Sequence, residues 1–491
     1  MSTRLYFRFL ILVTTPLLIL ACARNPVTGK REISLMSTEQ EIAIGKESHP
    51  SVIATMGLYD DEKLQAFMNQ KGKAMASISH RPDLPYQFYI VDSPIVNAFA
   101  VPGGYVYFTR GILAHFNNEA EFSGVLGHEI GHITAKHAAR SQKSQLLSTI
   151  ALIGGAVLAP QVVGQNIEAL QQGLGLLSLK YSRDHESESD KLGVEYASKI
   201  GYDARQMGDF FGTLKRISDQ SGQAIPQFMS THPDPGNRFT RVHELAQDYQ
   251  AKNPASYQVN RDQYLRLIDG MMYGEDPKQG FVENNSFYHP ALRFQFPVPA
   301  GWQSQNSPSQ FQMAAKDGKA AMILMVAKGN SLDEAAQNLV KELGLNVVEN
   351  GKTTINGNPA YVLISRQQPQ QGQQQSQQQD PKTTLQIGTW LIQYNNAIYA
   401  LHGLATNADF TANFSTFKRV SENFRSLNDP DKLNRQAERV VVKSTPRDGS
   451  FREVVTQLGM PANRVEEAGI LNGLKADDRV TRGTLIKIIN R

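Results

Sequence analysis

The most constraining feature of the chain is the pentapeptide His-Glu-Ile-Gly-His at residues 128–132. It lies within residues 118–142, which we expect to form one long helix, because an asparagine can cap its start and two glutamates follow in the first turn. Residues four apart share one face of a helix, so the imidazoles of His128 and His132 can reach one metal ion. Glu129 lies beside them, placed to take a proton from a water molecule bound to that ion.

A second polar segment offers the further ligand that such a metal site needs. Two imidazoles, one carboxylate and one open position are a ligand set typical of zinc. Residues 182–200 predict a second helix, in which Glu186 and Asp190 are four apart and share a face. One of these carboxylates can bind zinc while the other hydrogen-bonds a ligand histidine. His185, in the same cluster, is a rival ligand.

The spacing excludes a third histidine ligand from the first helix. The longer zinc motif of the metzincins requires glycine at position 135 and histidine at position 138, where this chain has Ala135 and Ala138. His137 misses the required position by one residue. We therefore expect His137 to face solvent on the same helix.

This combination of an HExxH motif and a following ExxxD motif resembles the HtpX/BepA-like gluzincin metallopeptidases. The resemblance implies that Glu186 is the third zinc ligand and that Asp190 supports it from outside the ligand sphere. It also implies that His232 and Arg238 approach the active site, where such a histidine either blocks the zinc or stabilises an oxyanion. The resemblance runs from Asn25 to about Tyr249 and includes residues 25–29, 97–104, 118–121 and 230–233.

The resemblance implies a zinc-dependent endopeptidase with one zinc ion per chain and polypeptide substrates. Zinc would lower the pKa of its bound water to about 7 and polarise the scissile carbonyl. Glu129 would take the proton from that water and deliver it to the leaving amine. His232 or Arg238 would stabilise the oxyanion. Residues 97–106 are expected to form an edge strand that pairs with an extended substrate.

We expect an α+β chain with three parts after its first 21 residues. Residues 22–275 are expected to form a mainly helical, zincin-like metalloprotease domain with a small edge-strand sheet. Residues 281–428 predict an α+β accessory domain, whose start resembles PsbP-like domains and which holds a Gln-rich loop at 367–379. Residues 436–491 predict a small βααβ module.

The last module resembles a LysM domain. The expected order is a strand at 439–443, helices at 450–458 and 463–471, and a strand at 484–489. LysM domains bind polymers of N-acetylglucosamine, so the resemblance implies peptidoglycan as a partner. The alternative is a small packing module without affinity for sugars.

The N-terminus reads as an export signal. Arg4 and Arg8 precede an apolar run at residues 9–21, which is too short to span a bilayer as a helix. Cys22 follows this run and is the only cysteine of the chain. The arrangement resembles a bacterial lipobox, which implies lipidation at Cys22 and a periplasmic protein anchored at the outer membrane. A second apolar segment, residues 146–163, is expected to form a buried or mobile helical hairpin rather than a membrane span.

The sequence gives no reason to expect nucleic acid or nucleotides as partners. Lys and Arg number 50 against 46 Asp and Glu, so the net charge is only +4, far from the basic balance of nucleic-acid-binding proteins. Residues 351–353 match the last three residues of a phosphate-binding loop motif. The motif also requires a glycine five positions before residue 351, where this chain has Asn346.

The leading hypothesis is a zinc endopeptidase that cleaves misfolded or misassembled proteins of the bacterial envelope. One alternative is a chaperone or adaptor lipoprotein whose site is gated by His232. The other is a peptidoglycan-binding envelope protein with little protease activity.

Overall fold

The computed structural model describes residues 22–33, 36–141, 181–221, 227–233, 237–367 and 384–490. The fold is α+β, as predicted. The expected signal segment, the apolar segment 146–163 and nearly all of the Gln-rich loop lie outside the described residues. Where the structure is described, no helix combines the length and hydropathy needed to cross a membrane.

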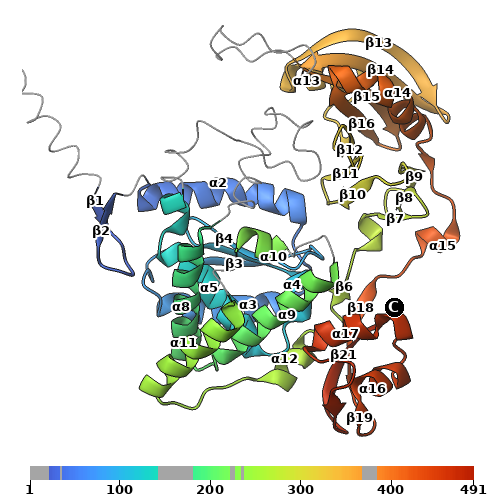
Figure 1. Ribbon diagram of the computed structural model, residues 1–491. Helices are drawn as coiled ribbons and strands as arrows, with labels where there is room; N and C mark the ends of the chain where they lie inside the picture. The colour runs from blue at the N-terminus through green and yellow to red at the C-terminus, as the bar shows by residue number, and fades with distance from the viewer. Residues whose placement is uncertain are drawn as a thin grey trace, which may run out of the picture.

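The N-terminal part of the molecule is mainly helical (Figure 1). Its longest helices pack around a small sheet, and most of them contribute to the largest apolar cluster. They are α2 (Thr38–Met56), α3 (Glu62–Ser77), α5 (Glu119–Thr134), α8 (Arg183–Lys199), α9 (Arg205–Ser221) and α11 (Arg238–Lys252); the shorter helices are α4 (Arg110–His115), α10 (Gln227–Thr231) and α12 (Arg261–Leu267).

The sheet has the strand order β3-β5-β4, with β3 (Gln87–Val91) parallel to β5 (Tyr105–Thr109) and β4 (Ala98–Val101) antiparallel to it. The edge strand predicted at 97–106 is therefore confirmed only at residues 98–101, because residues 105–106 begin the central strand β5. Alternate side chains point to opposite faces of a strand. On β5, Phe108 packs into the cluster with α3 and α5, whereas Tyr107 packs with residues of α2.

The long helix predicted at 118–142 is shorter than expected. α5 ends at Thr134, and Lys136 has a φ of 55°, in the left-handed region. A separate helical turn follows at residues 137–141. Because a left-handed residue cannot continue an α-helix, the chain changes direction at this point.

The C-terminal module contains the predicted βααβ elements in order: β18 (Glu438–Ser444), α16 (Phe451–Gln457), α17 (Val465–Asn472) and β21 (Leu485–Asn490). It also has two short strands that were not predicted, β19 (Gly449–Ser450) and β20 (Arg479–Val480), which pair with each other. β18 pairs with β21 and also with β6 (Met272–Tyr273). β6 follows α12, the last helix of the helical part. Apolar residues of the module belong to the same buried cluster as those of the helices. The module and the helical part therefore share one core. Its role in glycan binding stays a prediction.

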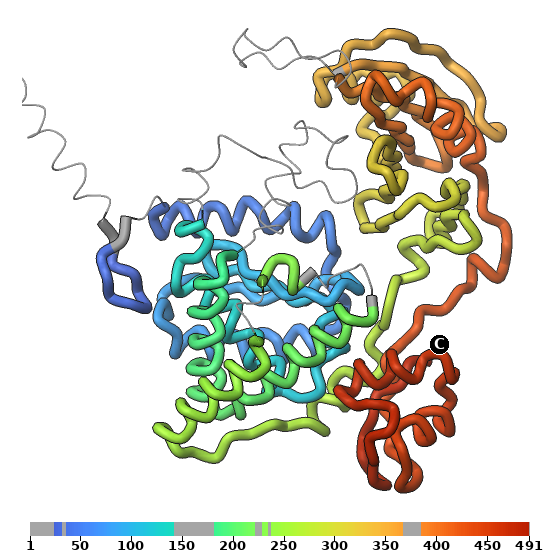
Figure 2. Tube along the Cα trace, in the orientation of Figure 1, coloured from blue at the N-terminus to red at the C-terminus, as the bar shows by residue number. Residues whose placement is uncertain are grey.

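The intervening residues form a second unit, which Figures 1 and 2 show apart from the helical part. Its sheet is antiparallel, in the order β10 (Gln303–Asn306), β11 (Gln310–Ala314), β12 (Ala320–Val326), β16 (Ala397–Thr406), β15 (Leu385–Tyr394), β14 (Asn358–Gln367) and β13 (Leu345–Ile355). Two helices, α13 (Leu332–Glu342) and α14 (Asn407–Glu422), pack on this sheet. They cover opposite faces of it, because Trp390 on β15 contacts Phe414 of α14, whereas the next residue, Leu391, clusters with Ala335 and Ala336 of α13.

The chain enters this second unit just after β6 and returns from it to β18. Since β6 and β18 pair with each other, the unit is inserted between two hydrogen-bonded strands. A smaller four-stranded sheet, in the order β17 (Arg425–Ser426), β9 (Phe294–Pro297), β8 (Ser286–His289) and β7 (Phe281–Glu283), lies where the chain enters and leaves.

Candidate metal centre

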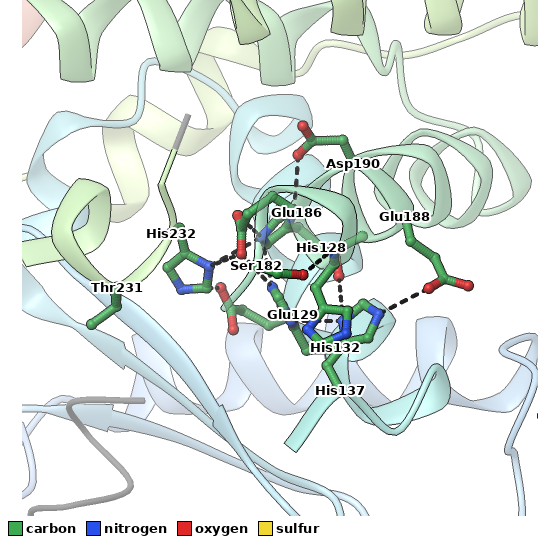
Figure 3. Close-up of polar contacts among 12 residues, drawn as sticks. His128, Glu129, His132, His137, Ser182, Glu186, Glu188, Asp190, Thr231 and His232 are labelled. Carbon is green, nitrogen blue, oxygen red and sulfur yellow. Dashed lines mark hydrogen bonds and ion pairs between the residues drawn. The ribbon is translucent and has the colours of Figure 1, made fainter. Parts of the chain in front are cut away.

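Two buried helices bring the predicted ligands together. α5 supplies His128 and His132, and α8 supplies Glu186, whose side chains are all fully buried or nearly so (Figure 3). The helices approach closely because glycines lie at their crossing: a Cβ on Gly127 would lie 3.0 Å from the Cα of Gly193. This close approach lets a short carboxylate side chain on α8 reach the histidines of α5.

The spacing of these donors fits a zinc ion. Nε2 of His128 lies 3.0 Å from Nε2 of His132 and 3.4 Å from Oε2 of Glu186. Nε2 of His132 lies 3.5 Å from Oε1 of Glu186. Tetrahedral zinc with bonds of about 2.0–2.1 Å separates its donors by about 3.3 Å. The three side chains could therefore bind one ion without rearrangement.

Buried carboxylate oxygens at this place have no hydrogen-bond partner among the described residues. They are both oxygens of Glu129 and Oε2 of Glu186. A buried carboxylate is costly unless it is paired or binds a cation. These oxygens, which accept no hydrogen bond within the described part of the chain, thus fit a site built for a metal ion and for a water molecule beside it.

Burial and neighbouring charges tune the protonation of the site. Burial raises the pKa of Glu129 above the usual value of a glutamic acid and lowers the pKa of His132 well below that of a free imidazole. Burial also acts to lower the pKa of His128, but hydrogen bonds to Asp190 and Glu186 outweigh it and raise that pKa to about 9. A neutral His132 keeps the lone pair that a metal ligand needs.

Asp190 and Arg238 lie behind His128. Oδ1 of Asp190 is 3.0 Å from Nδ1 of His128, the ring nitrogen that points away from the other donors. The guanidinium of Arg238 donates to both oxygens of Asp190, at 2.5 and 3.1 Å, and stacks on the ring of Phe211 at 3.8 Å. Arg238 also lies 3.4 Å from Glu186. The structure thus places Arg238 behind the ligands, in contact with Asp190.

His232 lies among the predicted ligands. Its Nδ1 is 3.3 Å from Nε2 of His128 and 3.2 Å from Oε1 of Glu186. Its Nε2 is 3.7 Å from Oε1 of Glu129. One donor atom from each of His128, His132, Glu186 and His232 lies within 4.8 Å of all the others. His232 could therefore serve as a fourth ligand.

The expectation that His137 faces solvent is wrong. Its side chain is fully buried, and its Nδ1 lies 2.9 Å from Nδ1 of His132. The turn at Lys136 carries it back toward the site. Sequence reasoning also passed over Tyr181, whose ring stacks on that of His132 at 3.9 Å. His185 stacks on His137 and is not among the clustered donors.

A small cavity opens beside His132. Residues 100–103, at the end of the edge strand β4, line one side of it, and Tyr181 lines another. Glu41 also lines it and forms ion pairs with Arg81 and Lys136. The end of the edge strand and the candidate ligand His132 thus line the same cavity.

A helix with the HExxH motif, a carboxylate ligand from a later helix and an edge strand beside the site define a metallopeptidase domain of the zincin type. The family comparison agrees, because residues 62–246 match the family model of Peptidase family M48. The predicted family resemblance is therefore confirmed over residues 62–246.

Two curated relatives each match less than half of the chain. The putative beta-barrel assembly-enhancing protease of Vibrio cholerae is 30% identical over 233 residues, which cover 46% of this chain and 48% of that protein. The mitochondrial metalloendopeptidase OMA1 of Arabidopsis thaliana is 33% identical over 175 residues, which cover 35% of this chain and 34% of that protein. The chain spans half or less of the length of these two relatives.

Among solved structures, cyanobacterial PsbP from Synechocystis sp. PCC 6803 matches 31% of this chain and 98% of its own. The sequence identity is 10% and the TM-score is 0.24. A score this low does not establish a shared fold.

Proposed function

We propose that the protein is a zinc-dependent endopeptidase of the bacterial cell envelope, which hydrolyses peptide bonds of misfolded or misassembled envelope proteins. The observation that carries this proposal is the carboxylate of Glu129. It is fully buried, accepts no hydrogen bond from the described residues and lies next to three donors spaced for zinc. A purely structural zinc site has no use for such a carboxylate.

The residues have distinct tasks in this proposal. His128, His132 and Glu186 hold the ion, which when bound supplies an acidified water and polarises the scissile carbonyl. Glu129 takes the proton of the attacking water and delivers it to the leaving amine, and its raised pKa suits both transfers. Asp190 accepts a hydrogen bond from His128 and fixes its orientation, while Arg238 holds Asp190 in place.

The substrate is a polypeptide in an extended conformation. Among the described strands β4 lies at an edge of its sheet, and its last residues line the cavity beside His132. An extended segment can add to such an edge through main-chain hydrogen bonds. The choice of envelope proteins as substrates is supported by the relative in Vibrio cholerae named for beta-barrel assembly. Lipidation at Cys22 and anchoring at the outer membrane are supported by the sequence of the first 22 residues.

A second candidate function is favoured by the position of His232. Catalytic zinc sites keep one position open, whereas structural sites are closed by a fourth protein ligand. The ring nitrogen of His232 lies as close to His128 and Glu186 as those two ligands lie to each other. If His232 occupies the fourth position, it gates the site, and the protein works as a chaperone or adaptor until the gate opens.

Cleavage of casein and of an unfolded outer-membrane protein by residues 23–491 tests the proposal. We expect cleavage that stops on chelation and returns when zinc is added back. Cleavage that persists in the metal-free protein would contradict the proposed mechanism. Bound zinc without cleavage would favour the gated alternative.

A further inference from the structure

The face of His132 that points away from the donor cluster carries a second imidazole. Nε2 of His132 faces the other ligands, and Nδ1 lies 2.9 Å from Nδ1 of His137. On His128 the corresponding nitrogen is held by the carboxylate of Asp190, at 3.0 Å. Both ligand imidazoles therefore have a partner at the nitrogen that does not face the cluster.

The backbone break after α5 is what brings His137 to this place. Successive residues of an α-helix are rotated by about 100°, so a residue five positions after His132 would point well away from it in a continuous helix. The helix ends at Thr134, and Lys136 takes a φ of 55°. Such a conformation is unfavourable for a residue with a side chain. The position of His137 is therefore obtained at the cost of local strain.

His137 is in turn held by a carboxylate from α8. Its Nε2 lies 3.1 Å from Oε2 of Glu188, and its ring stacks on that of His185, with centroids 4.3 Å apart. Arg140 donates to the same oxygen of Glu188 at 2.6 Å. Figure 3 shows Glu188 and His137 facing each other beside the donor cluster.

The hydrogen positions follow from what a metal ligand requires. When Nε2 of His132 gives its lone pair to a metal, Nδ1 of the same ring carries the hydrogen. That hydrogen points to Nδ1 of His137, which must then be an acceptor. The hydrogen of His137 therefore sits on Nε2, where it is donated to Glu188. The hydrogen bonds thus lead from the metal ligand to a carboxylate, and the hydroxyl of Ser189 lies 3.3 Å from the same Nδ1 of His137.

We propose that His137 and Glu188 are positioning residues for the zinc ligand His132, as Asp190 is for His128. This inference rests on the proposed zinc site. Three alternate residues of α8 then serve one ion: Glu186 binds it, Asp190 orients one histidine, and Glu188 orients the other through His137. Partners of this kind fix the tautomer and rotation of a ligand imidazole and raise its basicity.

The test compares zinc affinity in Glu188→Ala and Glu188→Gln, measured by competition with a chelator of known affinity. Loss of such a partner typically costs about 10–100-fold in metal affinity. We expect a loss in that range for Glu188→Ala. Glu188→Gln keeps an oxygen that accepts from Nε2 of His137 and should recover part of the affinity. In cleavage assays at saturating zinc, kcat should fall while KM stays unchanged, because no contact with the substrate is removed.

Glu195→Ala is the matched control. Glu195 lies on the same helix, pairs with a cation at 2.6 Å and has an exposed side-chain fraction of 22%, against 20% for Glu188. Its removal should leave zinc affinity unchanged. Zinc affinity in Glu188→Ala equal to that of the wild type would overturn this inference alone. A wild-type protein that binds no zinc would overturn the proposed function and this inference together.

Discussion

At the scale of single residues, His232 is the side chain whose role matters most for activity. Three donors already satisfy a catalytic zinc ion, and His232 places a fourth nitrogen 3.2 Å from Glu186. It follows the short helix α10, and its buried ring stacks on that of Phe228, with centroids 4.4 Å apart.

We predict that His232→Ala raises the rate of cleavage and leaves one zinc ion bound. If only about 10% of the molecules have His232 displaced at any time, removing the side chain gives about a tenfold rise. The measurement is casein cleavage with zinc content assayed on the same samples. A fall in rate with full zinc content would assign His232 to stabilisation of the oxyanion instead. An unchanged rate would remove it from the mechanism.

The cluster of candidate metal ligands could be predicted from the sequence, but the residues behind His132 could not. Glu186 and the two histidines lie on regular helices, where spacing alone fixes the face on which a residue lies. The position of His137 depends on the left-handed backbone of Lys136. Neither residue 135 nor residue 136 is a glycine or a proline, so the sequence gives no sign that the helix ends there. Helical spacing therefore placed His137 on the wrong side.

At the scale of elements, the crossing of α5 and α8 determines the geometry of the metal site. The ligands come from both helices, so their separation depends on how closely the backbones approach. A Cβ on Gly127 would lie 3.0 Å from both the Cα and the carbonyl oxygen of Gly193. These are backbone atoms of a buried helix, which cannot move aside as a flexible side chain can.

We predict that Gly127→Ala weakens zinc binding and lowers the free energy of unfolding by about 1–3 kcal/mol, the usual cost of overpacking a core. The control is Gly212→Ala on α9, where the added Cβ meets only the ring of Phe239, which is 46% exposed. That change should be neutral or stabilise by up to about 1 kcal/mol, since alanine favours a helix. Chemical denaturation and zinc competition measure both effects. Equal behaviour of the two variants would contradict the role given to the crossing.

At the scale of the whole molecule, the C-terminal module stabilises the start of the metal-binding helix. Lys487 of β21 is fully buried and donates to the carbonyl oxygens of Ala114, at 2.9 Å, and Phe116, at 2.8 Å. These carbonyls end α4, and the last carbonyls of a helix have no partner within it. Two residues after Phe116, Asn118 caps α5. The last strand of the chain thus holds the loop that leads into α5.

We predict that Lys487→Met lowers the free energy of unfolding by about 2–3 kcal/mol, because it leaves buried carbonyls without a donor. The exposed lysine of the neighbouring strand gives the control, and Lys443→Met should change stability by less than about 0.5 kcal/mol. Chemical denaturation of full-length variants is the measurement. A loss in Lys487→Met no larger than in the control would show that the module does not hold this loop.

The order of the three parts could be predicted from the sequence, but the core that the helical part shares with the C-terminal module could not. Strand and helix patterns show that one face of each element is buried, without showing which element covers it. β6 and β18 lie more than 160 residues apart in the sequence, and no pattern in either segment predicts that they pair. Their pairing makes the accessory unit an insertion rather than a link between two domains.

The most direct test of the central claim compares zinc content and proteolysis in the wild type and in Glu129→Gln. Glutamine keeps the shape of the side chain but cannot take a proton from water, and general-base catalysis contributes about 10²–10⁴-fold. We predict that both proteins bind one zinc ion per chain and that the variant loses cleavage by at least about 100-fold. Equal cleavage by a zinc-loaded Glu129→Gln protein would contradict the account.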